Sequence, residues 1–374
     1  MPNLVRVAPG ALVVGKPLPW TVYDHRGNVL LRQGYVIQNE SQLEQLFERG
    51  LFQPRKASRK EEQEVFDDTR ERNPFTDYPL LLKTLETTLS AIGDGRDNAP
   101  ERLQGLVRLV DRICREAPDP CLALVHLYSV EPTAYEQTLF YAIICQLVAN
   151  RLALEASRAH LLIAAALTAN IALIPFLDKL NASRRGLSPE QRTVIQKHPE
   201  LSVQALQQAG IQDPPLHDIV LQHHERSDGN GYPRGLGGID ILQEAQILSY
   251  AEHYVALITR RAYRERRSVS DAMKAIRASL SENPRPRIGQ ALLEVLTDYP
   301  PGCLVRLANN EVAVVTHRPV RHLGPMAQAI IGAKGDRYPG SFQRDCSELD
   351  FNIRAVEQPE IMPSMDFGLL WGFH

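Results

Sequence analysis

The residues with the clearest chemical potential in this sequence are two adjacent histidines, His223 and His224. They begin the stretch HHERSDGNGYPRGL, which contains three glycines and a proline. Neutral imidazoles are common ligands of transition metals, but neighbouring side chains on a helix point about 100° apart. Both rings can therefore reach one ion only where a helix ends or is distorted. Taken alone, the pair indicates either a metal site or a metal-free helix end, and the second is the more common arrangement.

The whole stretch is similar to the HHE, DG, GYP and GL signature of HD-GYP domains. Other matching segments are HPE at 198–200, LSPE at 187–190, and RAYR at 261–264 in place of the family's RPYR. The similarity extends over about 135–296. It implies a helical fold in which two or three metal ions, held by His, Asp and Glu, activate water for the hydrolysis of cyclic di-GMP.

The sequence departs from this family where the family binds its metals. With Ile174–Pro175 as the anchor, the family's His-Asp dipeptide falls on Leu167 and Thr168, and its phosphate-binding lysine falls on Ile171. The family's first ligand histidine falls on Gln137. An apolar and a neutral side chain cannot supply the charge that holds two dications close together. We therefore expect no working catalytic residues and treat four positions as vestigial: Gln137, Leu167, Thr168 and Ile171.

Four potential metal ligands remain. The resemblance assigns His198, His223 and His224 mainly to one metal, and the family's later ligand aspartate falls on Glu252. Three imidazoles with water form a sufficient coordination shell for one Zn or Fe ion. The sequence therefore predicts a single site for Fe, Mn or Zn, with a site that binds no metal as the alternative.

Two further segments are candidates for binding. The run at 260–267 contains five arginines, whose planar guanidinium groups suit phosphate, although a solvated helix end would show the same composition. Because the resemblance places this run near the family's ligand, we expect ligand binding at Arg261, Tyr263 and Arg264. In the family the GYP loop also contacts GGDEF-domain cyclases, so we expect an interaction loop formed by Asp228, Gly229, Gly231, Tyr232 and Pro233.

The remaining histidines favour structural roles. His217 and Asp218 reproduce the missing dipeptide. However, six positions separate His217 from His223, which is about 240° of helix rotation, so we expect a solvent-facing pair. His160 and His253 have no partner at ligand spacing.

The elements around these residues are mainly helical. The apolar spacing is helical over 78–300, with start signals at 188–191 and 268–271 and an interruption at 281–286. Apolar runs around turns at 24–28, 309–310 and 334–336 predict strands at both ends of the chain.

We expect a mainly α fold in which a helical HD-GYP-type domain is flanked by two small β-containing parts. The N-terminal module covers 1–55 and ends with a short helix at 41–48. A charged linker follows at 56–77, the helical domain covers 78–300, and a small C-terminal β appendage and tail cover 301–374.

Composition limits the remaining possibilities. The 374 residues are 44% hydrophobic with a net charge of −2, which provides no broad basic surface for nucleic acid or anionic lipid. Five scattered cysteines without a C-x-x-C pair fit buried thiols in a reducing compartment. The N-terminus lacks a secretory pattern. The apolar run at 161–177 holds polar residues and a proline, so we expect a buried core helix there. We expect a cytoplasmic protein with no membrane and no nucleic-acid partner, and a homodimer stays open.

Three functions fit these observations. The first is a signalling protein of the cyclic di-GMP network, whose degenerate HD-GYP domain binds cyclic di-GMP or a GGDEF-domain or other protein partner without hydrolysis. The second is a slow, metal-dependent cyclic di-GMP phosphodiesterase with one ion on three histidines. The third is a scaffold that binds neither nucleotide nor metal. Leu167 and Thr168 favour the first, so the sequence leans away from an enzyme.

Overall fold

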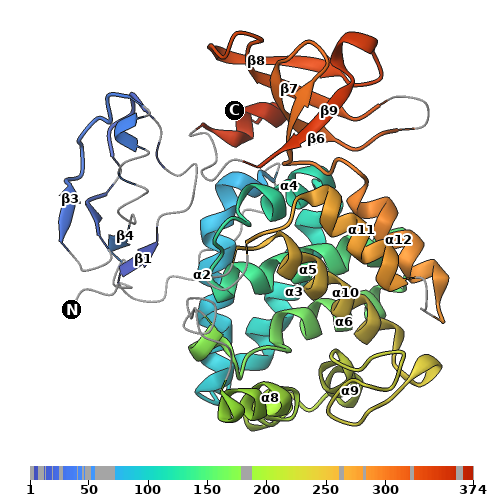
Figure 1. Cartoon of the computed structure of the whole chain (residues 1–374). Coiled ribbons are helices and arrows are strands. Elements are labelled where there is room, and N and C mark those ends of the chain that lie inside the picture. Colours follow the sequence, from blue (N-terminus) through green and yellow to red (C-terminus); the bar gives the residue numbers. More distant parts are fainter. Residues whose placement is uncertain are drawn as a thin grey trace. The chain divides into compact units, whose positions relative to one another are not determined.

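The computed structural model divides the chain into two compact units (Figure 1). One comprises residues 1–71 together with 359–374, and the other comprises residues 72–358. The described residues exclude the following positions: 1–3, 7–11, 13, 19, 25–27, 40, 44–45, 47–51, 55–71, 178–187, 261–264, 281–283, 321–323, 359–364 and 374.

The N-terminal unit contains a small antiparallel sheet. Its strands β1 (Leu4–Arg6), β2 (Val22–Tyr23), β3 (Val29–Leu31) and β4 (Phe52–Pro54) are ordered β1-β4-β2-β3. Strands β2 and β3 confirm the predicted hairpin around 24–28. Of the helix expected at 41–48, residues 41–43 and 46 are helical, and the rest lie outside the described residues.

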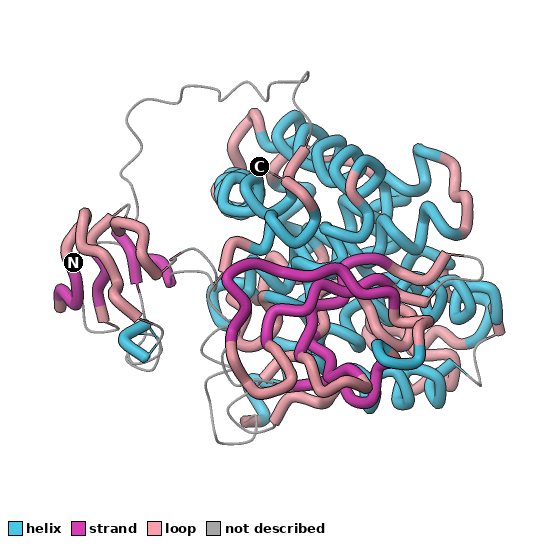
Figure 2. Tube along the Cα trace, turned by 90° about the horizontal axis from the view of Figure 1, so that it is seen from above, coloured by secondary structure: helices cyan, strands magenta, loops and turns pink. Residues whose placement is uncertain are grey.

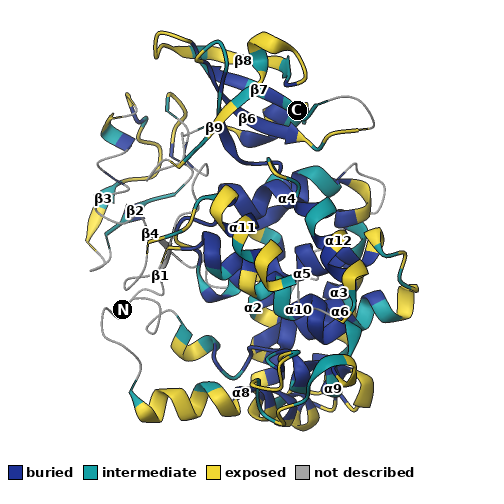
Figure 3. Cartoon of the chain, turned by 45° about the vertical axis from the view of Figure 1, so that its right-hand side comes forward, coloured by how far each residue is buried: buried dark blue, intermediate teal, exposed yellow. Residues whose placement is uncertain are grey.

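The second unit is dominated by helices, which confirms the mainly α prediction. In chain order they are α2 (Pro74–Gly93), α3 (Ala99–Glu116), α4 (Pro118–Leu127), α5 (Ala134–Arg151), α6 (Ala156–Thr168), α8 (Pro189–Gln208), α9 (Pro214–Gln222), α10 (Gln243–Ile258), α11 (Val269–Leu280) and α12 (Pro286–Leu296). Helix α5 is apolar on nearly every side and is buried along almost its whole length, whereas the first half of α8 is exposed (Figure 3). A helix that is apolar all round belongs in the centre of a bundle.

Local signals explain where several helices begin. Ser188 and Gln191 form the predicted capping box at the start of α8, and the Ser268 hydroxyl accepts the Asp271 N–H at 3.0 Å before α11. Helix α2 begins at Pro74, inside the stretch expected to be linker. The reason is that the Asn73 side chain accepts the N–H groups of Phe75 and Thr76 and caps this helix.

The apolar run at 161–177 is not one continuous helix. Helix α6 ends at Thr168, and residues 169–173 form a turn in which the Asn170 carbonyl accepts the Leu173 N–H at 2.8 Å. The prediction of a buried run is correct for 162–171, but the prediction of a single helix is wrong. Among the described residues, no helix is both long enough and apolar enough to cross a membrane.

The C-terminal part of this unit is a five-stranded antiparallel sheet of order β8-β7-β6-β5-β9, which forms its own layer beside the helices (Figure 2). Its strands are β5 (Leu304–Leu307), β6 (Val312–His317), β7 (Met326–Ile331), β8 (Arg337–Asp345) and β9 (Ile353–Glu357). The strands around both predicted turns are confirmed, whereas β9 was not anticipated.

The sheet is attached to α4. The Arg318 guanidinium donates to Asp119 at 2.5 Å, and a Cβ on Gly302 would lie 2.6 Å from the Ala123 carbonyl oxygen. The appendage expected at 301–374 is divided between the two units, since 301–358 belong to the second unit and 359–374 to the N-terminal unit. All five cysteines are free and buried, as predicted.

His126 connects α4 to α10 inside the helical domain. Its side chain is buried, its Nδ1 lies 3.0 Å from the Leu122 carbonyl oxygen, and its Nε2 lies 2.8 Å from the Tyr254 hydroxyl. Because a carbonyl oxygen only accepts, Nδ1 carries the proton and Nε2 accepts from Tyr254. Burial lowers the pKa of His126 to about 4.

We expect His126 to make stability depend on pH. An unfolded histidine titrates near pH 6.5, so the neutral buried ring stabilises the fold above that pH, and its contribution is lost as the pH falls towards 4. Between pH 7 and pH 5 this loss is roughly 2 kcal/mol. In metal-free protein, His126→Gln should unfold in less urea at pH 8 but lose less stability on acidification. Urea titrations at several pH values measure this, with His160→Gln as the control. An unchanged pH slope in His126→Gln would contradict it.

Candidate metal centre and cavity

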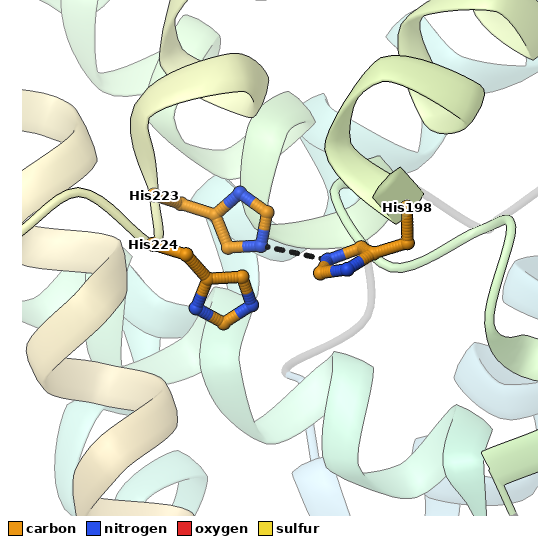
Figure 4. Close-up of side chains that lie close together, drawn as sticks. All are labelled: His198, His223 and His224. Carbon is orange, nitrogen blue, oxygen red and sulfur yellow. Dashed lines mark hydrogen bonds between the residues drawn. The ribbon is translucent and has the colours of Figure 1, made fainter. Parts of the chain in front are cut away.

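Three imidazole rings meet between α8 and the end of α9 (Figure 4). His198 lies within α8, His223 caps the C-terminus of α9, and His224 follows in the next turn. One ligand nitrogen from each ring lies within 4.8 Å of the others, and the Nε2 atoms of His198 and His223 are 3.2 Å apart. The end of the helix lets both neighbouring histidines face His198, as the sequence requires for a shared ion.

The hydrogen bonds of these rings leave two lone pairs facing each other. The Nδ1 atoms of His198 and His223 lie 2.5 and 2.6 Å from the carbonyl oxygens of Ile195 and Val220, so each Nδ1–H donates and each neutral Nε2 is a bare acceptor. Burial lowers the pKa of His198 to about 4 and that of His223 to about 3, which disfavours a proton between them. Two acceptors at 3.2 Å repel unless a cation lies between them.

A transition metal ion fits this arrangement. Zinc–nitrogen bonds of about 2.0–2.1 Å place two imidazole nitrogens on a tetrahedral ion about 3.3 Å apart, close to the separation of the His198 and His223 Nε2 atoms. Backbone carbonyls that hold Nδ1–H are a common way of orienting metal-binding histidines. The residues present therefore suit one divalent ion of the Fe, Mn or Zn type.

Glu252 of α10 lies beside this cluster. Its Oε2 is 3.9 Å from His224 Nε2, and its Oε1 accepts a 2.5 Å hydrogen bond from the side-chain amide of Asn170. Burial raises the pKa of Glu252 to about 8, against the opposing effect of the Asn170 hydrogen bond. The structure thus places Glu252, the possible fourth ligand, beside His224, together with Asn170, which the sequence analysis missed. The available signal was an amide inside an otherwise apolar run.

The four positions assigned as vestigial place no metal-binding atom in the three-histidine cluster. Leu167 and Thr168 are fully buried, and the Thr168 hydroxyl donates back to the Ala164 carbonyl oxygen at 2.7 Å. The Gln137 amide donates to the Pro132 carbonyl oxygen at 3.3 Å. Ile171 is apolar and buried. Among the described residues that line the adjacent cavity, none of these four is found.

A cavity of about 880 Å³ opens next to the cluster. Tyr141, Asn170, His224, Tyr232 and Glu252 contribute to its wall. Its wall combines aromatic and apolar side chains with many polar and charged ones. The predicted ligand-binding residues Arg261, Tyr263 and Arg264 lie outside the described residues.

The loop that follows the histidine pair is organised by Glu225. This buried carboxylate accepts the backbone N–H groups of Arg234 and Leu236 at 2.7 and 2.9 Å. The Tyr232 ring consequently packs over His224, with ring centroids 4.8 Å apart. The other predicted loop residues are Asp228, which accepts the Asn230 N–H, Gly229 with φ +73°, Gly231, and Pro233 after a cis peptide bond.

Gly231 allows the loop to close on the histidine turn. A Cβ at this position would lie 2.5 Å from the Arg226 nitrogen and the Glu225 Cα, and 2.6 Å from the His224 carbonyl oxygen. These are backbone atoms, so the clash cannot be relieved by a side-chain rotation.

We expect Gly231→Ala to displace the loop from the metal centre. Overpacking of this kind commonly costs about 1–3 kcal/mol, and here it would also move His224. Thermal unfolding and the affinity for Zn²⁺ should both decrease. Gly105→Ala is the matched control, because its Cβ meets no atom within 4 Å on helix α3. Equal Zn²⁺ affinity in wild type and Gly231→Ala would show that the loop does not position the centre.

The other histidines lie away from the cluster. The prediction of a solvent-facing His217 is wrong, since this ring is buried and its Nε2 lies 2.9 Å from the Ile211 carbonyl oxygen. The ring turns back onto the loop before α9, because it occupies the first turn of that helix. His160 contacts Asp111 at 3.3 Å. His253 is exposed at the cavity wall.

Comparisons with known proteins agree with this geometry. Residues 122–282 match the model of a family described as "HD domain", which overlaps the similarity proposed for 135–296. The chain is 33% identical over 150 residues to the cyclic di-GMP phosphodiesterase response regulator RpfG of Xanthomonas campestris pv. campestris, covering 39% of each chain. It is 25% identical over 218 residues to the cyclic di-GMP phosphodiesterase PA4108 of Pseudomonas aeruginosa, covering 58% of this chain and 52% of the relative.

The matched segments span about half or less of these two relatives. Among solved structures, an HDG"Y"P protein of Bdellovibrio bacteriovorus, Bd1817, aligns with a TM-score of 0.54 at 18% identity. That alignment covers 79% of this chain and 99% of the other, and it shows a shared fold. Residues 122–282 are therefore similar to HD domains, and this part of the chain is similar to proteins named cyclic di-GMP phosphodiesterases.

Proposed function

We propose that this HD domain holds one divalent transition metal ion and uses it to bind cyclic di-GMP, without efficient hydrolysis. The observation that carries the proposal is the meeting of His198, His223 and His224 beside a cavity, while Leu167 and Thr168 supply no ligand. Glu252 is the fourth ligand in this proposal. One ion can polarise a bound phosphate, but the charge that holds a second dication is missing.

In this proposal the GYP loop (Asp228–Pro233) is the surface that contacts a protein partner. Glu225 accepts two backbone N–H groups of the loop, and the outer residues of the loop, among them Asp228 and Gly229, are exposed. Because the Tyr232 ring of this loop packs on His224, the loop can report metal and nucleotide occupancy to a protein partner, such as a GGDEF-domain protein.

The test combines metal analysis with a nucleotide titration. Purified protein should contain about one equivalent of Fe, Mn or Zn, and calorimetry should detect cyclic di-GMP binding that is lost on chelation. Chromatography of the same mixtures should show intact cyclic di-GMP after long incubation. Protein that binds neither metal nor nucleotide would support the scaffold alternative, and steady conversion to a linear product would support a single-metal phosphodiesterase.

A further inference from the structure

We propose that Asn170 is a positioning residue that orients Glu252 so that only its Oε2 atom is presented to the three-histidine centre. The inference rests on the proposed single-metal function and deepens it. In this proposal Oε2 of Glu252 is the fourth ligand of the ion, and the Asn170 amide, on a different segment of the chain, determines that Oε2 faces the ion.

The first support is that the two carboxylate oxygens of Glu252 have different neighbours. Oε1 accepts the Asn170 amide N–H at 2.5 Å, whereas Oε2 lies 3.9 Å from His224 Nε2. The Glu252 side chain is only 11% exposed, so water does not compete freely for Oε1. Because the Asn170 amide occupies one acceptor site of Oε1, Oε2 is the oxygen that is more available to the ion.

The second support is that Asn170 itself is held in place. Its carbonyl accepts the N–H groups of Leu173 and Ile174 at 2.8 and 3.2 Å within the turn after α6. The Ser202 hydroxyl accepts the Ala172 N–H of the same turn at 3.3 Å. Ser202 lies on α8 one helical turn after His198. The turn that carries Asn170 is thus tied to the helix that carries the first histidine.

The third support comes from two other polar side chains of this region, Thr168 and Gln137, which donate their hydrogen bonds elsewhere. The Thr168 hydroxyl and the Gln137 amide both donate to backbone carbonyl oxygens of their own surroundings. Glutamate has three side-chain torsions, and an unrestrained carboxylate would lose rotational freedom on binding metal. An amide that fixes Glu252 beforehand removes part of that cost, as outer-shell partners of metal ligands generally do.

Zn²⁺ affinity provides the test. Metal-free full-length protein is titrated with Zn²⁺ against a chromophoric chelator. Asn170→Ala and Asn170→Ser, whose side chains cannot donate to Glu252 at this distance, should each weaken binding about tenfold to a hundredfold. Asn150→Ala is the matched control, because it removes an exposed asparagine that accepts from Gln146 on α5. The serine variant keeps a polar group and protects the test if the alanine variant folds poorly.

A double-mutant cycle separates positioning from simple packing. If Asn170 acts through Glu252, then Asn170→Ala should add no further loss in a Glu252→Ala background. The visible spectrum of Co²⁺-loaded protein gives a second readout, in which Asn170→Ala should resemble Glu252→Ala and differ from wild type. Additive losses, or a wild-type spectrum in Asn170→Ala, would overturn the inference.

The outcomes also distinguish this inference from the proposed function. If the wild-type protein binds no Zn²⁺, or if His198→Ala leaves the Zn²⁺ affinity unchanged, both the proposed function and the role of Asn170 are wrong. Wild-type protein whose binding depends on His198 but survives unchanged in Asn170→Ala or Asn170→Ser leaves the metal centre standing and defeats only the role of Asn170.

Discussion

Cyclic di-GMP hydrolysis by this protein is expected to be absent or very slow. Leu167 and Thr168 are fully buried and contribute neither charge nor a ligand atom to the metal centre. Loss of one preorganised electrostatic group commonly lowers a rate about a hundredfold to a thousandfold, and here several are absent together. The measurement is conversion of cyclic di-GMP to linear products by metal-loaded protein, with an active HD-domain phosphodiesterase assayed in parallel.

Restoring the dipeptide should recover only part of the activity. Leu167→His with Thr168→Asp returns two groups, while Gln137 and Ile171 remain unable to bind metal or phosphate. Because both positions are buried, thermal unfolding must confirm that the double variant is folded. Robust turnover by the unmodified protein, abolished by His224→Ala, would contradict the binding-protein interpretation and favour the single-metal enzyme.

Removal of one histidine from the cluster should weaken metal binding by about two orders of magnitude or more. Structural zinc sites have apparent binding free energies of about 10–16 kcal/mol, so each of four ligands contributes roughly 3 kcal/mol, and every 1.4 kcal/mol is tenfold. We expect this loss for His198→Ala and His223→Ala in Zn²⁺ competition titrations.

The same substitutions should affect the apo protein differently from the metal-bound one. Without metal, the Nε2 atoms of His198 and His223 repel each other at 3.2 Å, so the loss of one ring is partly offset by relief of that repulsion. The stabilisation by added Zn²⁺ should be smaller in both variants, by about 2.7 kcal/mol for a hundredfold loss of affinity. His217→Ala is the control, because its ring is buried outside the cluster. A Zn²⁺-dependent rise in melting temperature that is as large in His198→Ala as in wild type would argue against the site.

Several features of this protein are determined by local sequence alone. Ser188 and Gln191 specify the start of α8 because a capping box needs only residues three apart. The position of His223 and His224 at a helix end was also predictable, since the glycines that follow them cannot continue a regular helix cheaply. The same holds for the strands around Asn309–Asn310 and Lys334–Asp336, where turn residues separate apolar runs.

Other features depend on contacts between distant segments. The hydrogen bond between Asn170 and Glu252 joins residues 82 positions apart, and no local pattern specifies that approach. Strand β9 pairs with β5 across nearly fifty residues. His217 is buried because its ring turns onto the preceding loop, although helix periodicity alone favours solvent.

The sequence by itself therefore predicted the candidate metal ligands and the loss of the dipeptide, because residue type sets which atoms can bind a cation. Local contacts oriented the two histidines, and only the tertiary structure oriented the glutamate. The backbone carbonyls of Ile195 and Val220 bind the Nδ1–H groups of His198 and His223, which leaves Nε2 free in each ring. The Asn170 amide binds Oε1 of Glu252, which leaves Oε2 free. The orientation of each histidine follows from a local contact with a carbonyl three residues earlier in the chain. The glutamate choice exists only once α6 and α10 are packed together, because the amide and the carboxylate meet only in the folded domain.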